Sequence, residues 1–188
     1  MDQKAKGASV ELLLSFSRIV DWINQRIGWI ASWCVLISCV ISAGNATSRH
    51  AFSISSNAWL EIQWYLFSAM FLLGASHTLK MNEHVRVDIV YANVSPRKQL
   101  WIDLLGAIIF LLPAAAMMAW LSWPVFVKAF VSAEMSKDAG GLIRWPVMLL
   151  MPLGFALLTL QGISEVIKRV AALTGRYELR EKYHHLVQ

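Results

Sequence analysis

Four long stretches of the chain contain no charged residue, and short polar segments separate them. The uncharged runs are 22 residues between Arg26 and Arg49, 18 between Glu61 and Lys80, 24 between Asp103 and Lys128, and 20 between Arg144 and Glu165. Roughly 20 helical residues are needed to cross the hydrocarbon core of a bilayer. The pattern therefore predicts an all-α membrane protein with four transmembrane helices. Their expected bounds are about 27–46, 60–80, 101–124 and 145–165.

The segments outside these runs divide the chain into three parts. Residues 1–26 form a leader whose apolar positions Leu13, Phe16, Val20 and Ile23 follow helical spacing, which indicates an amphipathic helix. This helix could extend the first span into the cytoplasm or lie in the membrane interface. Residues 27–170 are the expected transmembrane domain, and residues 171–188 are a polar tail.

The distribution of positive charge predicts the orientation. The chain has 17 Lys and Arg residues and a net charge of +5. If both termini are cytoplasmic, segments 1–26, 80–103 and 165–188 hold 13 of the cations and the two opposite loops hold four. This asymmetry follows the positive-inside rule. We therefore expect both termini and the connector 80–103 inside, with membrane phospholipids rather than nucleic acid as the partners of the basic segments.

Several local signals refine the helix boundaries. Ser95-Pro96 and Trp145-Pro146 are typical of helix starts, and Gly140-Gly141 indicates a turn. Residues 84–91 in the connector mix charged and β-branched side chains, which favours a short segment along the headgroups. Prolines within the third and fourth spans, Pro113 and Pro152, predict kinks. Six of the nine Trp residues lie near expected span ends, as in an aromatic belt: Trp29, Trp59, Trp101, Trp120, Trp123 and Trp145.

Two features of the first half of the chain are candidate packing or pairing sites. Small side chains recur every fourth residue at Cys34, Ser38, Ser42 and Ala46, and such a column lets another helix approach closely in lipid. The two cysteines, Cys34 and Cys39, point to different helix faces and are not expected to pair. Glu61, in the first turn of the second span, complements the positive end of its helix or pairs with a cation such as Arg49.

No catalytic or cofactor motif is present in the sequence, so we expect no enzyme activity and no cofactor. There is no phosphate-binding loop, dinucleotide fingerprint or HExxH zinc motif. Two functions known for small helical membrane proteins fit this sequence poorly. A membrane anchor of a haem or quinone redox enzyme would need two His at matching depth, and no His lies mid-span. A stand-alone small exporter would need a polar site at mid-membrane, whereas Glu61, Asp103 and Glu165 lie at span ends.

The order of several short motifs resembles the small permease subunit of TRAP (tripartite ATP-independent periplasmic) transporters over roughly residues 25–170. The matching pieces are Asn45 with Arg49 and Phe52, Trp59 with Glu61, Gly74, the run His84-Val85-Arg86-Val87-Asp88, Ser95-Pro96, the segment from Trp123-Pro124 to Asp138-Ala139-Gly140-Gly141, and Trp145-Pro146. The N-terminal leader and the tail after Thr174 show no such resemblance.

This resemblance implies a multi-pass protein of the bacterial inner membrane that works with two partners. One is a large elevator-type permease subunit, which would hold the substrate and Na⁺ sites. The other is a periplasmic substrate-binding protein that delivers an organic acid, with uptake driven by sodium. The small subunit would then be a scaffold for the large one. Within it, His84, Arg86 and Asp88 are expected to hold the connector in place, and Lys137, Asp138 and Arg144 to contact the binding protein.

Overall fold

The computed structural model describes residues 2–54, 56–82, 94–175 and 177, and this part of the chain is helical apart from its loops. The helices are α1 (Asp2–Phe52), α2 (Asn57–Met81), α4 (Pro96–Gly106), η1 (Ala107–Leu111), α5 (Leu112–Val131) and α6 (Trp145–Leu173). The described residues contain no strand, only one isolated bridge between Met135 and Ile143. The predicted all-α class is confirmed.

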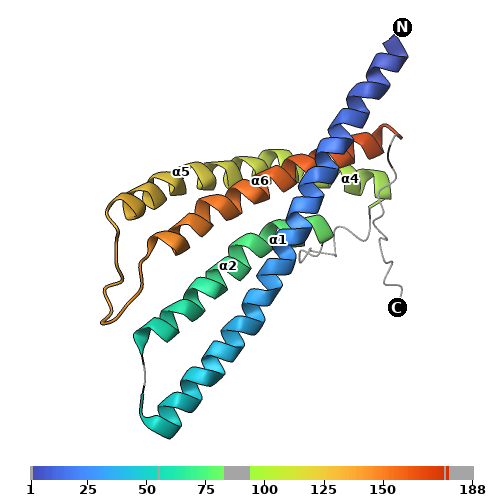
Figure 1. Ribbon diagram of the computed structural model, residues 1–188. Helices are drawn as coiled ribbons and strands as arrows, with labels where there is room; N and C mark the ends of the chain where they lie inside the picture. The colour runs from blue at the N-terminus through green and yellow to red at the C-terminus, as the bar shows by residue number, and fades with distance from the viewer. Residues whose placement is uncertain (1, 55, 83–93, 176, 178–188) are drawn as a thin grey trace, which may run out of the picture.

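The first helix is much longer than the predicted first span. At 1.5 Å per residue, the 51 residues of α1 extend about 77 Å, and Figure 1 shows its N-terminal part projecting beyond the other helices. The leader is thus helical and continuous with the span, which is the geometry of an extension. The first span was expected to end near residue 46, whereas residues 47–52 are also helical. The helix ends only where Ser53 adopts a left-handed backbone, with φ +56°.

Among the residues that the structure describes, three helical rods have the length and apolar composition to cross a membrane: Val10–Phe52, Pro96–Val131 and Trp145–Leu173. The chain is accordingly a multi-pass membrane protein. The predicted span at 60–80 falls in α2, whose polar residues Gln63, Ser76 and His77 lower its hydropathy, and α2 is not among these three. A fourth span and the N-in, C-in orientation remain predictions.

The helices pack around α6. It contacts α1, α2, α4 and α5, and α2 also packs along α1. Figure 1 shows α6 lying between α5 and α2, with α1 crossing both α2 and α6. The close approach depends on glycine: a Cβ added at Gly154 would lie 2.7 Å from the carbonyl oxygen of Leu72 in α2, and one added at Gly162 would lie 2.9 Å from Leu112.

The bundle has two distinct ends, visible in Figure 1. At the loop end, residues 53–56 join α1 to α2 and residues 132–144 join α5 to α6. At the connector end, α2 finishes, α4 begins and α6 finishes. As predicted, α4 starts at Pro96 after Ser95, and α6 starts at Trp145.

The rod Pro96–Val131 is interrupted by a π-helical turn, η1. In η1 the backbone N–H of Leu112 donates to the carbonyl of Ala107, five residues back. Pro113 follows directly, and a proline ring clashes with the carbonyl four residues earlier in a regular α-helix. The wider turn relieves that clash, which is a common use of π-bulges. The predicted irregularity at Pro113 therefore takes the form of a bulge in one continuous rod.

The distribution of polarity is the reverse of that in a water-soluble protein. The largest fully buried side chains are Gln161, Asn24, Ser17, Ser76 and Ser164. Large apolar side chains cover the exterior, with Trp120 79% and Phe110 73% exposed. Such a surface suits contact with lipid or with apolar helices of a partner.

Candidate functional site

The main polar site is a cluster of side chains at the connector end, which we call the polar core. Its members come from four helices: Ser17, Asp21 and Asn24 in α1, Lys80 in α2, Asp103 in α4, and Gln161, Ser164, Glu165, Lys168 and Arg169 in α6. It contains three acids and three cations. Its charges therefore balance within the subunit.

Lys168 is at the centre of the ionic part. Its Nζ lies 3.1 Å from both carboxylate oxygens of Asp21 and 2.5 Å from Oε1 of Glu165. Only 10% of the Lys168 side chain and 4% of the Glu165 side chain are exposed. One ammonium group thus joins α1 to α6, and it compensates two acids that would otherwise be buried close together.

Arg169 extends the ionic part to α4. Its Nη1 donates to Oε2 of Glu165 at 2.7 Å, and its Nε lies 3.7 Å from Oδ2 of Asp103. Glu165 therefore receives a cation on each carboxylate oxygen. Because Asp103 is in α4, this ion pair fixes α4 against the last turns of α6.

Amide and hydroxyl groups complete the polar core. The Asn24 amide donates to Gln161 at 2.7 Å, and the Gln161 amide in turn donates to Asp21 at 3.0 Å and Glu165 at 2.9 Å. Ser17 and Ser164 donate to each other's backbone carbonyls. Through Gln161, the carboxylates of Asp21 and Glu165 accept hydrogen bonds from a neutral donor as well as from cations.

α2 joins the polar core through Lys80. Its Nζ donates to the backbone carbonyl of Asp21 at 3.1 Å and to Gln25 at 2.7 Å. Helices α1, α2, α4 and α6 therefore meet in one layer of hydrogen bonds and ion pairs. Counting along α6 from Trp145, Gln161 lies about 24 Å and Lys168 about 35 Å away. A hydrocarbon core about 30 Å thick that began at Trp145 would therefore end within this layer.

Asp103 and Glu165 were predicted at span ends, but the sequence did not predict that they share one cluster. A detectable signal was present in α6, where polar residues recur at positions 161, 164, 165, 168 and 169. This spacing puts them on one helix face. The matching face of α1 carries Ser17, Asp21 and Asn24, but nothing in the sequence states that the two faces meet.

A second polar site is formed by Glu61 at the loop end. Its Oε1 accepts a hydrogen bond from the Ser136 hydroxyl and its Oε2 accepts one from the backbone N–H of Leu142 at 2.6 Å. Tyr65 donates to the carbonyl of Ile143 at 3.1 Å. In the part of the chain that the structure describes, no ion pair joins Glu61 to Arg49. The carboxylate instead holds the loop between α5 and α6 on α2.

That loop is a small hairpin built on its own contacts. Ser136 N–H donates to Leu142 at 2.9 Å, and Arg144 pairs with Glu134. Gly140 has φ +72°, and a Cβ at Gly141 would lie 2.5 Å from Ser136. Lys137 and Asp138 are exposed at the tip, whereas Arg144 is already engaged within the hairpin.

The remaining predicted packing residues lie between α1 and α2 or outside the described residues. Cys34 is buried, Ser38 is half-buried and Ser42 is exposed, so the small-residue column leaves the packed interior toward the loop end. Gly74 faces Ala31 across the helix pair, with 3.9 Å between the positions of their Cβ atoms. Asn45 and Arg49 line a cavity near the end of α1. Another three predicted residues lie outside the described part: His84, Arg86 and Asp88.

The polar core can cross-link helices, and its geometry offers little for ligand chemistry. Each of its acids is already within an ion pair. Among the described residues, no group of three or more His, Cys, Asp or Glu side chains could hold a metal ion.

Comparison with known proteins places these features in a family. Residues 37–172 match the family model described as tripartite ATP-independent periplasmic transporters, DctQ component, which confirms the resemblance seen in the motifs. No curated protein and no solved structure matches the chain. The match begins within α1, at residue 37, and continues to residue 172, one residue before the end of α6. The chain belongs to the DctQ family, the small permease component of tripartite ATP-independent periplasmic transporters.

Proposed function

We propose that this subunit is a static scaffold for the large permease of a sodium-driven, binding-protein-dependent transporter of organic acids. In this proposal it crosses the bacterial inner membrane four times, with the connector end in the cytoplasm and the loop end in the periplasm. The large elevator-type subunit carries the substrate and Na⁺ sites. A periplasmic binding protein delivers the substrate.

The observation that supports a scaffold role best is that the buried charges are used within the subunit. Lys168 and Arg169 neutralise Asp21, Glu165 and Asp103, and each contact joins one helix to another or braces α6 itself. A translocation site needs polar groups that can exchange their partners for a solute or ion. Here the strongest polar groups hold helices together.

The exterior supports the same role. A frame in lipid must offer apolar surface to a partner, since helix association in membranes depends on close packing and on hydrogen bonds between helices. The faces of α5 and α6 provide an open apolar groove lined by Trp120, Trp123, Leu149, Leu153 and Leu160, among others.

The four-span topology rests on length and on the place of α2 in the bundle. Its 25 residues extend about 38 Å, enough to cross the hydrocarbon core. It packs between α1 and α6, both of which have span composition. With an even number of crossings, the termini share a side, and the excess of Lys and Arg favours the cytoplasm.

The described histidines do not favour the redox-anchor alternative. His50 is near the loop end of α1, while His77 is near the connector end of α2. Two axial haem ligands must lie at the same depth on facing helices, and these two residues are at opposite ends of the bundle.

Deletion of the subunit in cells that keep the large permease and the binding protein tests this proposal. Uptake should fall to background, and the affinity of the purified binding protein for its substrate should not change. Re-expression of the chain should restore uptake only when a sodium gradient is imposed. Full uptake without the chain would contradict the scaffold role. Uptake driven equally by a proton gradient would contradict only the proposal that sodium is the coupling ion.

A further inference from the structure

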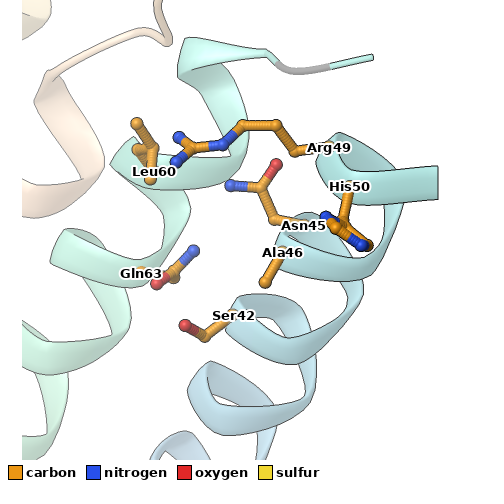
Figure 2. Close-up of a pocket in the computed structure, with 7 residues that line it drawn as sticks. All are labelled: Ser42, Asn45, Ala46, Arg49, His50, Leu60 and Gln63. Atoms are coloured by element: carbon orange, nitrogen blue, oxygen red, sulfur yellow. The ribbon is translucent and has the colours of Figure 1, made fainter. Parts of the chain in front are cut away.

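A cavity of about 450 Å³ opens between α1 and α2 at the loop end, far from the polar core. Polar side chains from both helices line it: Ser42, Asn45, Arg49, His50 and Gln63. Figure 2 shows Arg49 reaching from α1 toward Leu60 on α2, with the amide of Asn45 beneath it and Gln63 further along the gap.

Its positive charge has no counter-ion within the described chain. No Asp or Glu lines the cavity. Arg49 takes part in none of the ion pairs or hydrogen bonds among the residues that the structure describes, in contrast to Lys168 and Arg169. Glu61, an acid in the first turns of α2, accepts hydrogen bonds from Ser136 and Leu142 with its two carboxylate oxygens. The cavity therefore presents an uncompensated guanidinium.

Hydrogen-bond donors accompany the guanidinium. Within the described part, the side chains of Asn45 and Ser42 also make no hydrogen bond, although neighbours such as Thr47 donate to their own helix. An arginine with nearby amide and hydroxyl groups suits an anion with several oxygens, because the guanidinium can donate two parallel bonds to a carboxylate or phosphate.

The position of the cavity favours a lipid over a dissolved anion. Arg49 is in the last turn of α1, and strongly exposed aromatic side chains lie close to the lining residues in sequence: Phe52, three residues after Arg49, is 71% exposed, and Trp64, next to Gln63, is 70% exposed. Aromatic side chains and long cations gather at the headgroup level of membranes. Basic pockets between membrane helices bind lipid headgroups.

We propose that this cavity binds the phosphate of an anionic phospholipid, with Arg49 as the charge partner and Asn45 as a hydrogen-bond donor. The bound headgroup would fill the gap between the loop ends of α1 and α2, and its acyl chains would lie along the apolar exterior below. This inference needs only that α1 spans the membrane, so it stands independently of the proposed transport function.

Native mass spectrometry of the full chain in detergent, titrated with phosphatidylglycerol or phosphatidylcholine, tests the proposal. The wild-type chain should retain phosphatidylglycerol selectively. R49Q should lower its occupancy at least about tenfold, as expected for the loss of a charge-assisted hydrogen bond, and R49K should lose less. K128Q, which removes a cation at the same end of the bundle on α5, is the matched control and should bind as the wild type.

Several results would overturn the proposal. Equal retention of phosphatidylcholine, or equal losses in R49Q and K128Q, would show that no anionic headgroup site exists here. Displacement of the lipid by millimolar inorganic phosphate would assign the cavity to a dissolved oxyanion. Unchanged lipid binding in R49Q together with weaker association with the large permease would assign Arg49 to a subunit contact. Unchanged melting of R49Q and R49K serves to show that both variants fold.

Discussion

At the scale of single residues, Lys168 is the side chain on which the polar core depends most. It forms ionic hydrogen bonds with Asp21 on α1, at 3.1 Å, and with Glu165 on its own helix, at 2.5 Å. A buried ion pair adds little net stability compared with an apolar replacement of both partners. Removing one partner is costly, because a charge then stays buried without compensation.

The substitution Lys168→Met should therefore destabilise the fold strongly. It keeps much of the side-chain volume while leaving Asp21 and Glu165 close together without the ammonium group. We expect a loss of about 3–5 kcal/mol in the free energy of unfolding, measured as a lower melting temperature of the purified chain in detergent. Lys137→Met, at the exposed hairpin tip, is the control and should melt like the wild type. Equal melting of the two variants would show that the polar core is not a clamp.

Glu61 is the corresponding anchor at the loop end. Replacing it with leucine removes the acceptor for the Leu142 N–H, so we expect the amide hydrogen of Leu142 to exchange faster with solvent. Hydrogen exchange of the hairpin measures this directly. Asn57→Leu, which removes only the 3.1 Å bond to the carbonyl of Ala139 near the tip, should leave the Leu142 amide protected. Equal exchange in wild type and Glu61→Leu would mean that the hairpin holds itself in place.

At the scale of helices, the starts were more predictable than the ends. Ser95-Pro96 and Trp145-Pro146 mark helix starts through the fixed backbone of proline, and both agree with the structure. The end of α1 was placed too early because the polar Thr47 and the charged Arg49 were interpreted as the start of a loop. In the structure Asn45 and Arg49 line the α1–α2 cavity, and no proline or left-handed residue stops the helix before Ser53.

The contact between α2 and α6 depends on Gly154. A methyl group there would meet the backbone of Leu72, which cannot move as a flexible side chain does. Gly154→Ala should thus push the helices apart and lower the free energy of unfolding by about 1–3 kcal/mol, a typical overpacking penalty. Gly44→Ala on α1 is the matched control, since nothing lies within 4 Å of its added Cβ. A Gly154→Ala variant as stable as the wild type would show that α2 and α6 can move apart without loss of stability.

The hairpin between α5 and α6 contains the residues predicted to contact the periplasmic binding protein. Lys137→Glu and Asp138→Lys change only exposed charges at the tip, so we expect them to weaken docking several-fold while the melting temperature stays constant. Arg144→Glu should weaken docking and also lower the melting temperature, because it breaks the ion pair with Glu134. The readout is the substrate-bound binding protein's affinity for the reconstituted complex. Unchanged affinity in both tip variants would move the docking surface elsewhere.

At the scale of the whole molecule, the fold class and three of the spans follow from the spacing of charges alone. Runs without a charge determine where lipid can surround the chain. The polar core could not be found this way, because Asp21, Asp103 and Glu165 are far apart in sequence. Only the packing of α1 and α4 on α6 brings their charges together. The sequence shows that acids stand at span ends, and the structure shows which cations satisfy them.

In the proposed role, the subunit supports transport without carrying a solute itself. Reconstitution in liposomes tests it most directly: a sodium gradient is imposed, and uptake of a labelled substrate of the binding protein is followed with that protein outside. Vesicles that contain this chain together with the large permease should accumulate the substrate, whereas vesicles with this chain alone should stay at background. Accumulation by this chain alone would contradict the scaffold role.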